Sequence, residues 1–169
     1  MNILITRPLI DAEDLMGKLF SLGHKIIHIP TLQVKPVTNQ KCDAKNYDAF
    51  IFTSANAIRN LKLLNEDKKK LCFCVGSITE KIVRQKGYAN TISAGGNVNA
   101  LKNIILNSDF DKKKKIAYFC GDYISTDLDL DLKREGYLID KVINYSSEKI
   151  VDLNNENEKI LNKHPPDII

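Results

Sequence analysis

The stretch Asp48-Ala-Phe-Ile-Phe-Thr-Ser-Ala-Asn-Ala57 contains the change of pattern that decides the fold class. Residues 49–52 form a short apolar run rich in residues that favour β-structure, which predicts a buried strand. From Ala57 to Leu64 the apolar residues recur at helical spacing, so a helix should follow the strand directly. A strand that runs straight into a helix is typical of α/β proteins.

The junction between this predicted strand and helix is rich in polar groups. Thr53, Ser54 and Asn56 each carry a side-chain oxygen that could cap the helix N-terminus. The first turn of a helix has unpaired backbone N–H groups and a partial positive charge, so it could bind an anion at the carboxyl edge of a sheet. A well-capped junction without any ligand explains the same residues, and both interpretations remain open at this point.

Strand-like and helical segments alternate along the rest of the chain. The predicted helices end at glycines, as helices commonly do, at Gly23, Gly87 and Gly136. This alternation predicts an α/β fold with a parallel, doubly wound sheet and helices on both faces. The other predicted strands are residues 3–5, 25–29, 71–75, 89–94, 116–120 and 138–145.

The two ends of the chain carry further patterns. Segments 3–29 and 116–142 have apolar residues and a helix-ending glycine at matching spacing, which suggests two related halves, although all strand–helix–strand units share such a pattern. Residues 146–163 are polar with one helix-like run. Asp167-Ile-Ile169 then resembles the strand start at Asp48, so we expect the chain to stop where a strand begins.

Composition places the chain among ordinary globular proteins. Its 169 residues suffice for one domain of ordinary size or two small ones, and the apolar fraction of 43% predicts a real core. No apolar run is long enough to span a bilayer and no signal peptide starts the chain, so we expect no membrane partner. Cys72 and Cys74 share one face of a predicted strand and should be buried, and no histidine near the cysteines completes a metal site. We therefore expect a reduced, cytoplasmic protein without a metal.

The net charge of +4 comes largely from lysine runs at 68–70 and 112–115. These runs lack interleaved aromatic residues and glycines, so we expect no nucleic-acid partner. A mildly basic surface suits a small polyanionic molecule.

Six short motifs, in this order and at this spacing, resemble the uroporphyrinogen-III synthase family over essentially the whole chain. The two most telling are Ile3-Leu-Ile-Thr-Arg-Pro8 and the stretch from Asp48 to Ala57. The others are Val75-Gly-Ser-Ile-Thr79, Gly96-Asn97 with Leu101, Cys120-Gly121, and Val142-Ile-Asn-Tyr-Ser-Ser147.

The resemblance implies two α/β domains joined by a two-stranded linker. Residues 1–33 would begin the first domain, residues 36–146 would form the complete second domain, and residues 148–169 would start the return to the first. The family continues for several more elements, so the resemblance implies an incomplete first domain, a chain truncated at its C-terminus, and an activity that is left open.

The family is a cyclising hydro-lyase of tetrapyrrole and heme biosynthesis. The resemblance implies that hydroxymethylbilane, a linear tetrapyrrole rich in carboxylates, loses water and closes with inversion of its last ring, without a cofactor. Such a reactive substrate requires mainly a fixed geometry and help with the loss of hydroxide. Hydroxymethylbilane synthase could hand the substrate over, and we expect a monomer.

Carried over to this sequence, the resemblance implies one catalytic residue and a set of substrate contacts. Tyr145 would donate a proton to the departing hydroxyl, although an ordinary aromatic residue near a strand end explains it equally well. Arg7 would pair with a substrate carboxylate or form a surface ion pair. The remaining implied contacts are Thr53, Ser54, Ala55, Asn56, Gly76, Ser77, Thr79, Gly96, Asn97 and Gly121.

Two other classes of α/β protein fit the sequence less well. A nucleotide-using enzyme would carry a glycine-rich phosphate loop after the first strand, where Thr6-Arg7-Pro8 stands, and no Walker lysine motif occurs. A receiver module would need acidic residues near Arg7 and Thr53. A non-catalytic, flavodoxin-like module that binds a small molecule remains the alternative to the enzyme.

Overall fold

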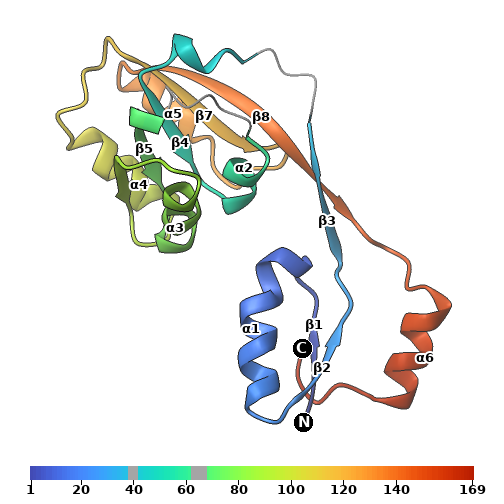
Figure 1. The fold of residues 1–169 in the computed structure, drawn as a ribbon. Helices are drawn as coiled ribbons and strands as arrows, with labels where there is room; N and C mark the ends of the chain where they lie inside the picture. The colour runs from blue at the N-terminus through green and yellow to red at the C-terminus, as the bar shows by residue number, and fades with distance from the viewer. Residues whose placement is uncertain (38–41, 62–67) are drawn as a thin grey trace. The chain divides into compact units, whose positions relative to one another are not determined.

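The computed structural model describes residues 1–37, 42–61 and 68–169 and divides the chain into two compact units (Figure 1). Unit 1 consists of Met1–Lys35 and Ser147–Ile169, and unit 2 is Pro36–Ser146. The segments expected from the sequence, 1–33, 36–146 and 148–169, have nearly the same bounds. Leu64 of the predicted second helix lies outside the described residues.

Unit 2 is built on parallel strands in the order β8-β7-β4-β5-β6. The central strand β4 is buried along its whole length, because it has a neighbour on each side and helices on both faces. The predicted α/β fold with a parallel, doubly wound sheet is therefore confirmed. The strands are β4 (Ala49–Phe52), β5 (Leu71–Cys74), β6 (Thr91–Ser93), β7 (Lys115–Gly121) and β8 (Leu138–Lys149).

The helices of unit 2 follow the strands as predicted. They are α2 (Ala55–Arg59), α3 (Ser77–Gln85), α4 (Val98–Leu106) and α5 (Leu128–Arg134), with a short 3-10 helix, η1 (Ala44–Asn46), before β4. Helix α2 packs against α3, and α4 packs against α5.

Alternate residues of the strands form two apolar layers in unit 2. Ile51, Tyr118 and Cys120 join the core beside α4 and α5. The residues between them in sequence, among them Phe52 and Phe119, face the other way, and their stacked rings lie 5.6 Å apart. These two layers bury the β-branched and aromatic residues that predicted the strands.

Strand β3 (Leu32–Pro36) pairs with β8 in the same six-stranded sheet. The Ile150 amide donates to the Thr31 carbonyl at 2.9 Å, and the Val37 amide donates to the Asn144 carbonyl at 3.0 Å. Residue numbers rise on one strand as they fall on the other, so the pair is antiparallel. The chain passes from unit 1 to unit 2 through β3 and returns through β8.

Unit 1 contains the parallel pair β1 (Asn2–Ile5) and β2 (Lys25–His28) with helices α1 (Leu9–Ser21) and α6 (Asn155–Lys163). Ile168 forms a parallel bridge with Ile3, and the Leu4 amide donates to the Ile168 carbonyl at 2.8 Å. The last residues thus pair with β1 at one isolated bridge, and the expectation that a strand begins here stays a prediction.

Helix α1 ends as predicted, but its leucines are partly exposed. The chain leaves it through Gly23, whose φ of +81° lies in the left-handed region that glycine adopts easily. Leu15 of the helix and Leu22, which caps its end, stand at helical spacing but are 44% and 72% exposed, and the buried helical residue is Ala12. Helical spacing correctly predicted the element, but spacing cannot indicate which face another element covers.

Within the described ranges, no helix is both long enough and apolar enough to span a membrane.

Candidate functional site

The sheet of unit 2 brings most of the sequence-predicted residues to one edge. Because its strands are parallel, their carboxyl ends all lie at the same edge. The polar turn Thr53–Asn56 follows β4, Gly76 and Ser77 follow β5, and Gly96-Asn97 follows β6. At the same edge β7 ends at Gly121, which pairs with Tyr145 of β8.

The strand order marks one point of this edge as special. After β4 the chain moves to β5 and β6 on one side, and then crosses back to β7 on the other side of β4. Ligands of doubly wound sheets bind outside the carboxyl ends of the two strands at which the order reverses. In unit 2 these strands are β4 and β7, so Ser54 and Gly121 flank the expected binding position.

Tyr145 reaches this point from β8 and packs against Gly121. A Cβ atom added at Gly121 would lie 2.7 Å from two ring carbons of Tyr145, so the ring occupies the space that any side chain at position 121 would need. Tyr145 is 9% exposed. Burial raises the pKa of Tyr145, while hydrogen bonds with Ser54 and with the Gly121 backbone act in the opposite direction. The phenol therefore keeps its proton at neutral pH and can donate it.

Ser54 is the residue that caps α2. Its hydroxyl accepts a hydrogen bond from the Asn56 amide at 3.2 Å, whereas the Asn56 side-chain oxygen accepts from the Arg59 guanidinium at 3.0 Å. Of the three candidate caps in the sequence, Ser54 is the one whose extended backbone and short side chain suit the position. The same hydroxyl is the hydrogen-bond partner of Tyr145. The Ser54 hydroxyl therefore contacts both the first turn of α2 and the phenol.

Tyr118 is a residue of this region that the sequence analysis missed. It lies on β7, is 1% exposed, and its hydroxyl is 3.1 Å from that of Thr53. Burial raises the pKa of Tyr118 to about 12, although the hydrogen bond with Thr53 lowers it. In the sequence Tyr118 resembles any core aromatic residue, and the one available signal was that a buried phenol needs a polar partner.

The turn after β6 folds back onto the turn after β5. The Gly96 amide donates to the Val75 carbonyl at 2.7 Å, and a Cβ at Gly76 would lie 3.2 Å from the Gly96 Cα. Gly96 itself has a φ of +118°, which only glycine adopts without strain. Asn97 accepts from the Ala100 amide at 2.7 Å and caps α4.

Comparison with protein families gives a match along nearly the whole chain. The family model described as uroporphyrinogen-III synthase HemD matches residues 13–169. The chain belongs to the uroporphyrinogen-III synthase family. This match favours the synthase prediction over the flavodoxin-like module. A comparison with curated protein sequences found no match.

Solved structures of uroporphyrinogen-III synthases have the same fold. The Helicobacter pylori enzyme has a TM-score of 0.57 at 18% identity, over 82% of this chain and 62% of its own. A mutant of the Thermus thermophilus enzyme has a TM-score of 0.62 at 14% identity, over 99% of this chain and 71% of its own. The wild-type Thermus thermophilus enzyme has a TM-score of 0.54 at 15% identity, over 99% and 70%. The chain thus spans less than two thirds of the length of the Helicobacter pylori enzyme.

Three residues expected from the family resemblance lie differently from the others. Thr79 is only 5% exposed, because the third residue of α3 turns toward the sheet, so its side chain is not presented at the edge. Gly121 is also buried and contacts the Tyr145 ring rather than solvent. Arg7 belongs to unit 1, where its side chain is exposed and its carbonyl oxygen lies 2.9 Å from Nε2 of His28.

The cysteines of this family member are unsuited to chemistry at the edge. None of the four cysteines, all within the described ranges, is joined in a disulfide there; Cys72 and Cys74 are buried as predicted, and Cys120 is buried as well. Burial raises the pKa of Cys74 to about 12 and that of Cys120 to about 11, so both remain thiols at neutral pH. Among the residues that the structure describes, no group of side chains has the arrangement of a metal site.

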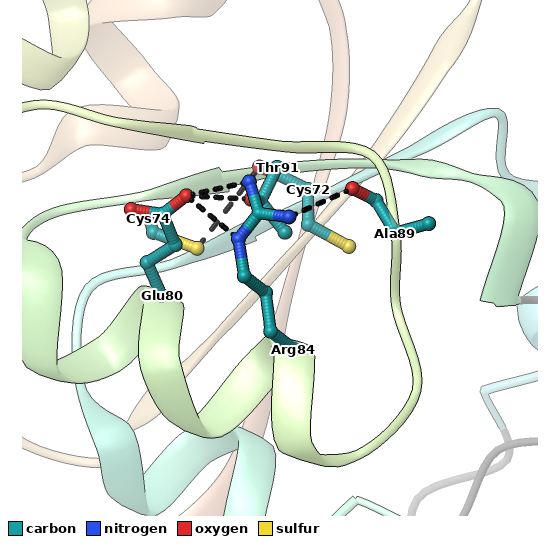
Figure 2. A network of polar contacts seen from close by, with 6 residues as sticks. All are labelled: Cys72, Cys74, Glu80, Arg84, Ala89 and Thr91. Carbon is teal, nitrogen blue, oxygen red and sulfur yellow. Dashed lines mark hydrogen bonds and ion pairs between the residues drawn. The ribbon is translucent and has the colours of Figure 1, made fainter.

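A second polar cluster of unit 2 joins α3 to β6 (Figure 2). One carboxylate oxygen of Glu80 accepts from Nε and an NH2 of Arg84, at 3.1 and 3.0 Å, and from the Thr91 hydroxyl at 2.7 Å. Arg84 also donates to the Ala89 carbonyl at 3.2 Å. These bonds attach α3 to β6 and lower the pKa of Glu80.

Proposed function

We propose that this chain acts as a uroporphyrinogen-III synthase. It would cyclise hydroxymethylbilane to uroporphyrinogen III, with inversion of the last pyrrole ring and loss of water. The family match over residues 13–169 supports this proposal. The observation that carries it in the structure is the protonated, buried phenol of Tyr145 beside Ser54 at the carboxyl edge where the strand order reverses.

Tyr145 is proposed as the proton donor in the step that loses water. Its phenol would donate to the hydroxyl at the end of hydroxymethylbilane, so that the C–O bond breaks with water rather than hydroxide leaving. General acid assistance of this kind requires a donor that is protonated at neutral pH, and burial provides that for Tyr145. Ser54 would hold the phenol oxygen in place through its hydroxyl.

The remaining edge residues are proposed to bind the carboxylates of the substrate. Backbone N–H groups and hydroxyls in turns are suitable donors to carboxylates, and an arginine adds a charge-assisted bond. Holding many carboxylates at once fixes one geometry of a reactive chain, which is the larger part of the task because the substrate needs no strong nucleophile. The proposed contacts at this edge of unit 2 are Thr53, Ser54, Ala55, Asn56, Gly76, Ser77, Gly96 and Asn97, and Arg7 of unit 1 stays a separate prediction.

The remaining expectations stand as part of this proposal. We propose a cytoplasmic monomer that uses no cofactor and receives its substrate from hydroxymethylbilane synthase.

A coupled assay tests the proposed function. Freshly generated hydroxymethylbilane is added to the chain, the products are oxidised, and the type I and type III uroporphyrins are separated. We expect type III above the level of a control without protein. Formation of type I alone would overturn the proposed function for this chain.

The role of Tyr145 is tested in the same assay. We expect Tyr145→Phe to lower the rate about tenfold or more, which corresponds to about 1.4 kcal/mol of lost transition-state stabilisation. Tyr137→Phe is the matched control, because Tyr137 is also buried, at 3% exposed, but precedes β8 at the edge of the sheet opposite the proposed contacts. A Tyr145→Phe protein with the wild-type rate would show that another group donates the proton.

A further inference from the structure

The pairing of β7 with β8 is interrupted just before Tyr145. Cys120 pairs with Ile143, but the next residue of β7, Gly121, pairs with Tyr145, which leaves Asn144 as an extra residue on β8. The ladder then resumes, since the Asp122 amide donates to the Tyr145 carbonyl at 3.1 Å. Asn144 is therefore the inserted residue of a β-bulge, a feature that often re-aims a side chain next to an active site.

The bulge changes the face on which Tyr145 lies. Before it, the side chains of β8 alternate, and Lys141 and Ile143 point toward the layer of α4 and α5, where Lys141 pairs with Asp129. Regular alternation would send Asn144 to the α2 face and Tyr145 back to the α5 face. Instead, Asn144 bonds to Ala57 of α2, and Tyr145 bonds to Ser54, the residue that caps α2.

The Asn144 side chain also ties α2 to the sheet. It is 7% exposed, and its Nδ2 donates to the Ala57 carbonyl at 2.6 Å. Ala57 lies near the end of α2, where carbonyl groups lack helical partners. A helix of five residues has little stability of its own, so this bond matters for where the turn Thr53–Asn56 lies.

One atom of Asn144 is unfavourable for stability. Its Oδ1 is buried and has no hydrogen-bond partner among the residues that the structure describes. An unpaired buried amide oxygen is destabilising, and an apolar side chain of similar size would avoid that loss. Stability alone therefore does not explain why an asparagine, with its Nδ2 donor to Ala57, occupies this position.

We propose that Asn144 is a positioning residue for Tyr145. By forming the bulge it turns the phenol toward Ser54, and through its bond to Ala57 it holds α2 and the turn Thr53–Asn56 at a fixed distance from that phenol. The inference rests on the proposed function, in which Tyr145 donates a proton to the substrate.

The first test observes Tyr145 directly, without turnover. The full chain is labelled with 3-fluorotyrosine, and the Tyr145 resonance is assigned by its loss in Tyr145→Phe. We expect Asn144→Ala and Asn144→Asp to move or broaden this resonance, while the exposed helix α4 variant Asn103→Ala leaves it unchanged. Asn144→Asp matches asparagine in size but lacks an N–H donor, and at mildly acidic pH its protonated carboxyl can again donate to Ala57. The resonance of this variant should then return toward the wild-type position.

The second test measures kinetics on hydroxymethylbilane. A displaced donor lowers the rate of the chemical step more than it weakens substrate binding, so we expect kcat to fall roughly ten- to a hundredfold in Asn144→Ala with little change in KM. Asn103→Ala should retain wild-type kinetics.

The two tests separate the inference from the proposed function. Wild-type protein that makes only type I product would end the proposed function, yet the fluorine spectra would still decide whether Asn144 positions Tyr145. If Asn144→Ala does not fold, the acid-dependent return of the resonance in Asn144→Asp decides. An unchanged Tyr145 resonance in the folded Asn144 variants overturns the inference.

Discussion

Two of the polar clusters that attach a helix to the sheet in unit 2 differ in how exposed their side chains are. The switch-point cluster, made of Ser54, Gly121, Asn144 and Tyr145, lies at the carboxyl ends of β4 and β7 and within β8, and its two large side chains are at most 9% exposed. The clamp cluster, made of Glu80, Arg84 and Thr91, lies over β6, and the Arg84 side chain is 52% exposed.

The two clusters also differ in how well their polar groups are paired. In the clamp cluster one Glu80 oxygen has three donors, as expected of a feature that stabilises the fold. In the switch-point cluster an amide oxygen is buried without a partner in the described part of the chain, and the Tyr145 ring fills the space that a side chain at Gly121 would need. Features that are not needed for stability, or that reduce it, tend to occur at functional sites. Changes in the first cluster should therefore alter the product, and changes in the second only the stability.

Gly121→Ala should have the largest effect. The added Cβ would lie 2.7 Å from the Tyr145 ring, which is held by the bulge and cannot move freely. Overpacking of this kind costs about 3 kcal/mol at its upper range, and we expect type III product to fall at least a hundredfold. Urea unfolding and the coupled assay measure the two effects.

Gly17→Ala is the matched control for this substitution. Gly17 lies within α1 with nothing within 4 Å of an added Cβ, so alanine should stabilise the helix by about 0.5–1 kcal/mol. Combining Gly121→Ala with Tyr145→Ala should regain stability relative to the sum of the single changes. Strict additivity of the two substitutions would mean that the ring and the added methyl do not collide.

The sequence was sufficient to predict the fold and several of the residues at the carboxyl edge. Hydrophobic patterns predicted the strands and helices, and the motifs from Asp48 to Ala57 and from Val142 to Ser147 indicated residues that reach the carboxyl edge. The matching spacing of segments 3–29 and 116–142 also has a structural counterpart. Ile3 pairs with Ile26 in β1 and β2, and Ile116 pairs with Ile139 in β7 and β8.

The arrangement within the switch-point cluster could not be predicted. Side chains along a strand alternate with a period of two residues. Nothing in the sequence around Asn144 indicates that this residue is skipped in the pairing of β7 with β8. Thr79 fitted the family motif but points into the core. Tyr118 bonds to Thr53 across two strands, a contact that depends on register rather than on local sequence. Long-range pairing decides such details, and a single sequence does not contain it explicitly.

The buried phenol of Tyr118 should have the next largest effect. Measuring the free energy of unfolding as a function of pH should reveal its contribution. Burial raises its pKa from the ordinary value near 10 to about 12, so the folded state holds the proton more tightly than the unfolded state does. This contribution is fully present below pH 10 and is lost as the pH rises toward 12. A difference of two pKa units corresponds to at most about 2.7 kcal/mol.

The variant Tyr118→Phe isolates this contribution. We expect it to cost about 1 kcal/mol at pH 8, because Thr53 loses its phenol partner, and to reduce the loss of stability between pH 10 and 12. Tyr123→Phe, at an exposed position, should change neither value. Parallel pH profiles for wild type and Tyr118→Phe would mean that the other buried phenols and thiols account for the whole alkaline loss.

Glu80→Gln should have the smallest effect and the opposite pH dependence. Hydrogen bonds from Thr91 and Arg84 lower the pKa of Glu80, so its contribution is present above the ordinary carboxyl pKa and is lost as the pH falls through the lowered value. Glutamine keeps the acceptor oxygen but not the charge, so we expect a loss of about 1 kcal/mol at pH 7 that disappears in acid. Thermal unfolding at both pH values measures this difference, with the exposed Glu13→Gln on α1 as control.

The ratio of type III to type I product in Glu80→Gln should stay at the wild-type value, because the clamp cluster holds α3 against β6 without reaching the switch point. A changed ratio would show that the two clusters are coupled through α3, whose N-cap Gly76 and first residue Ser77 lie at the same edge as Tyr145.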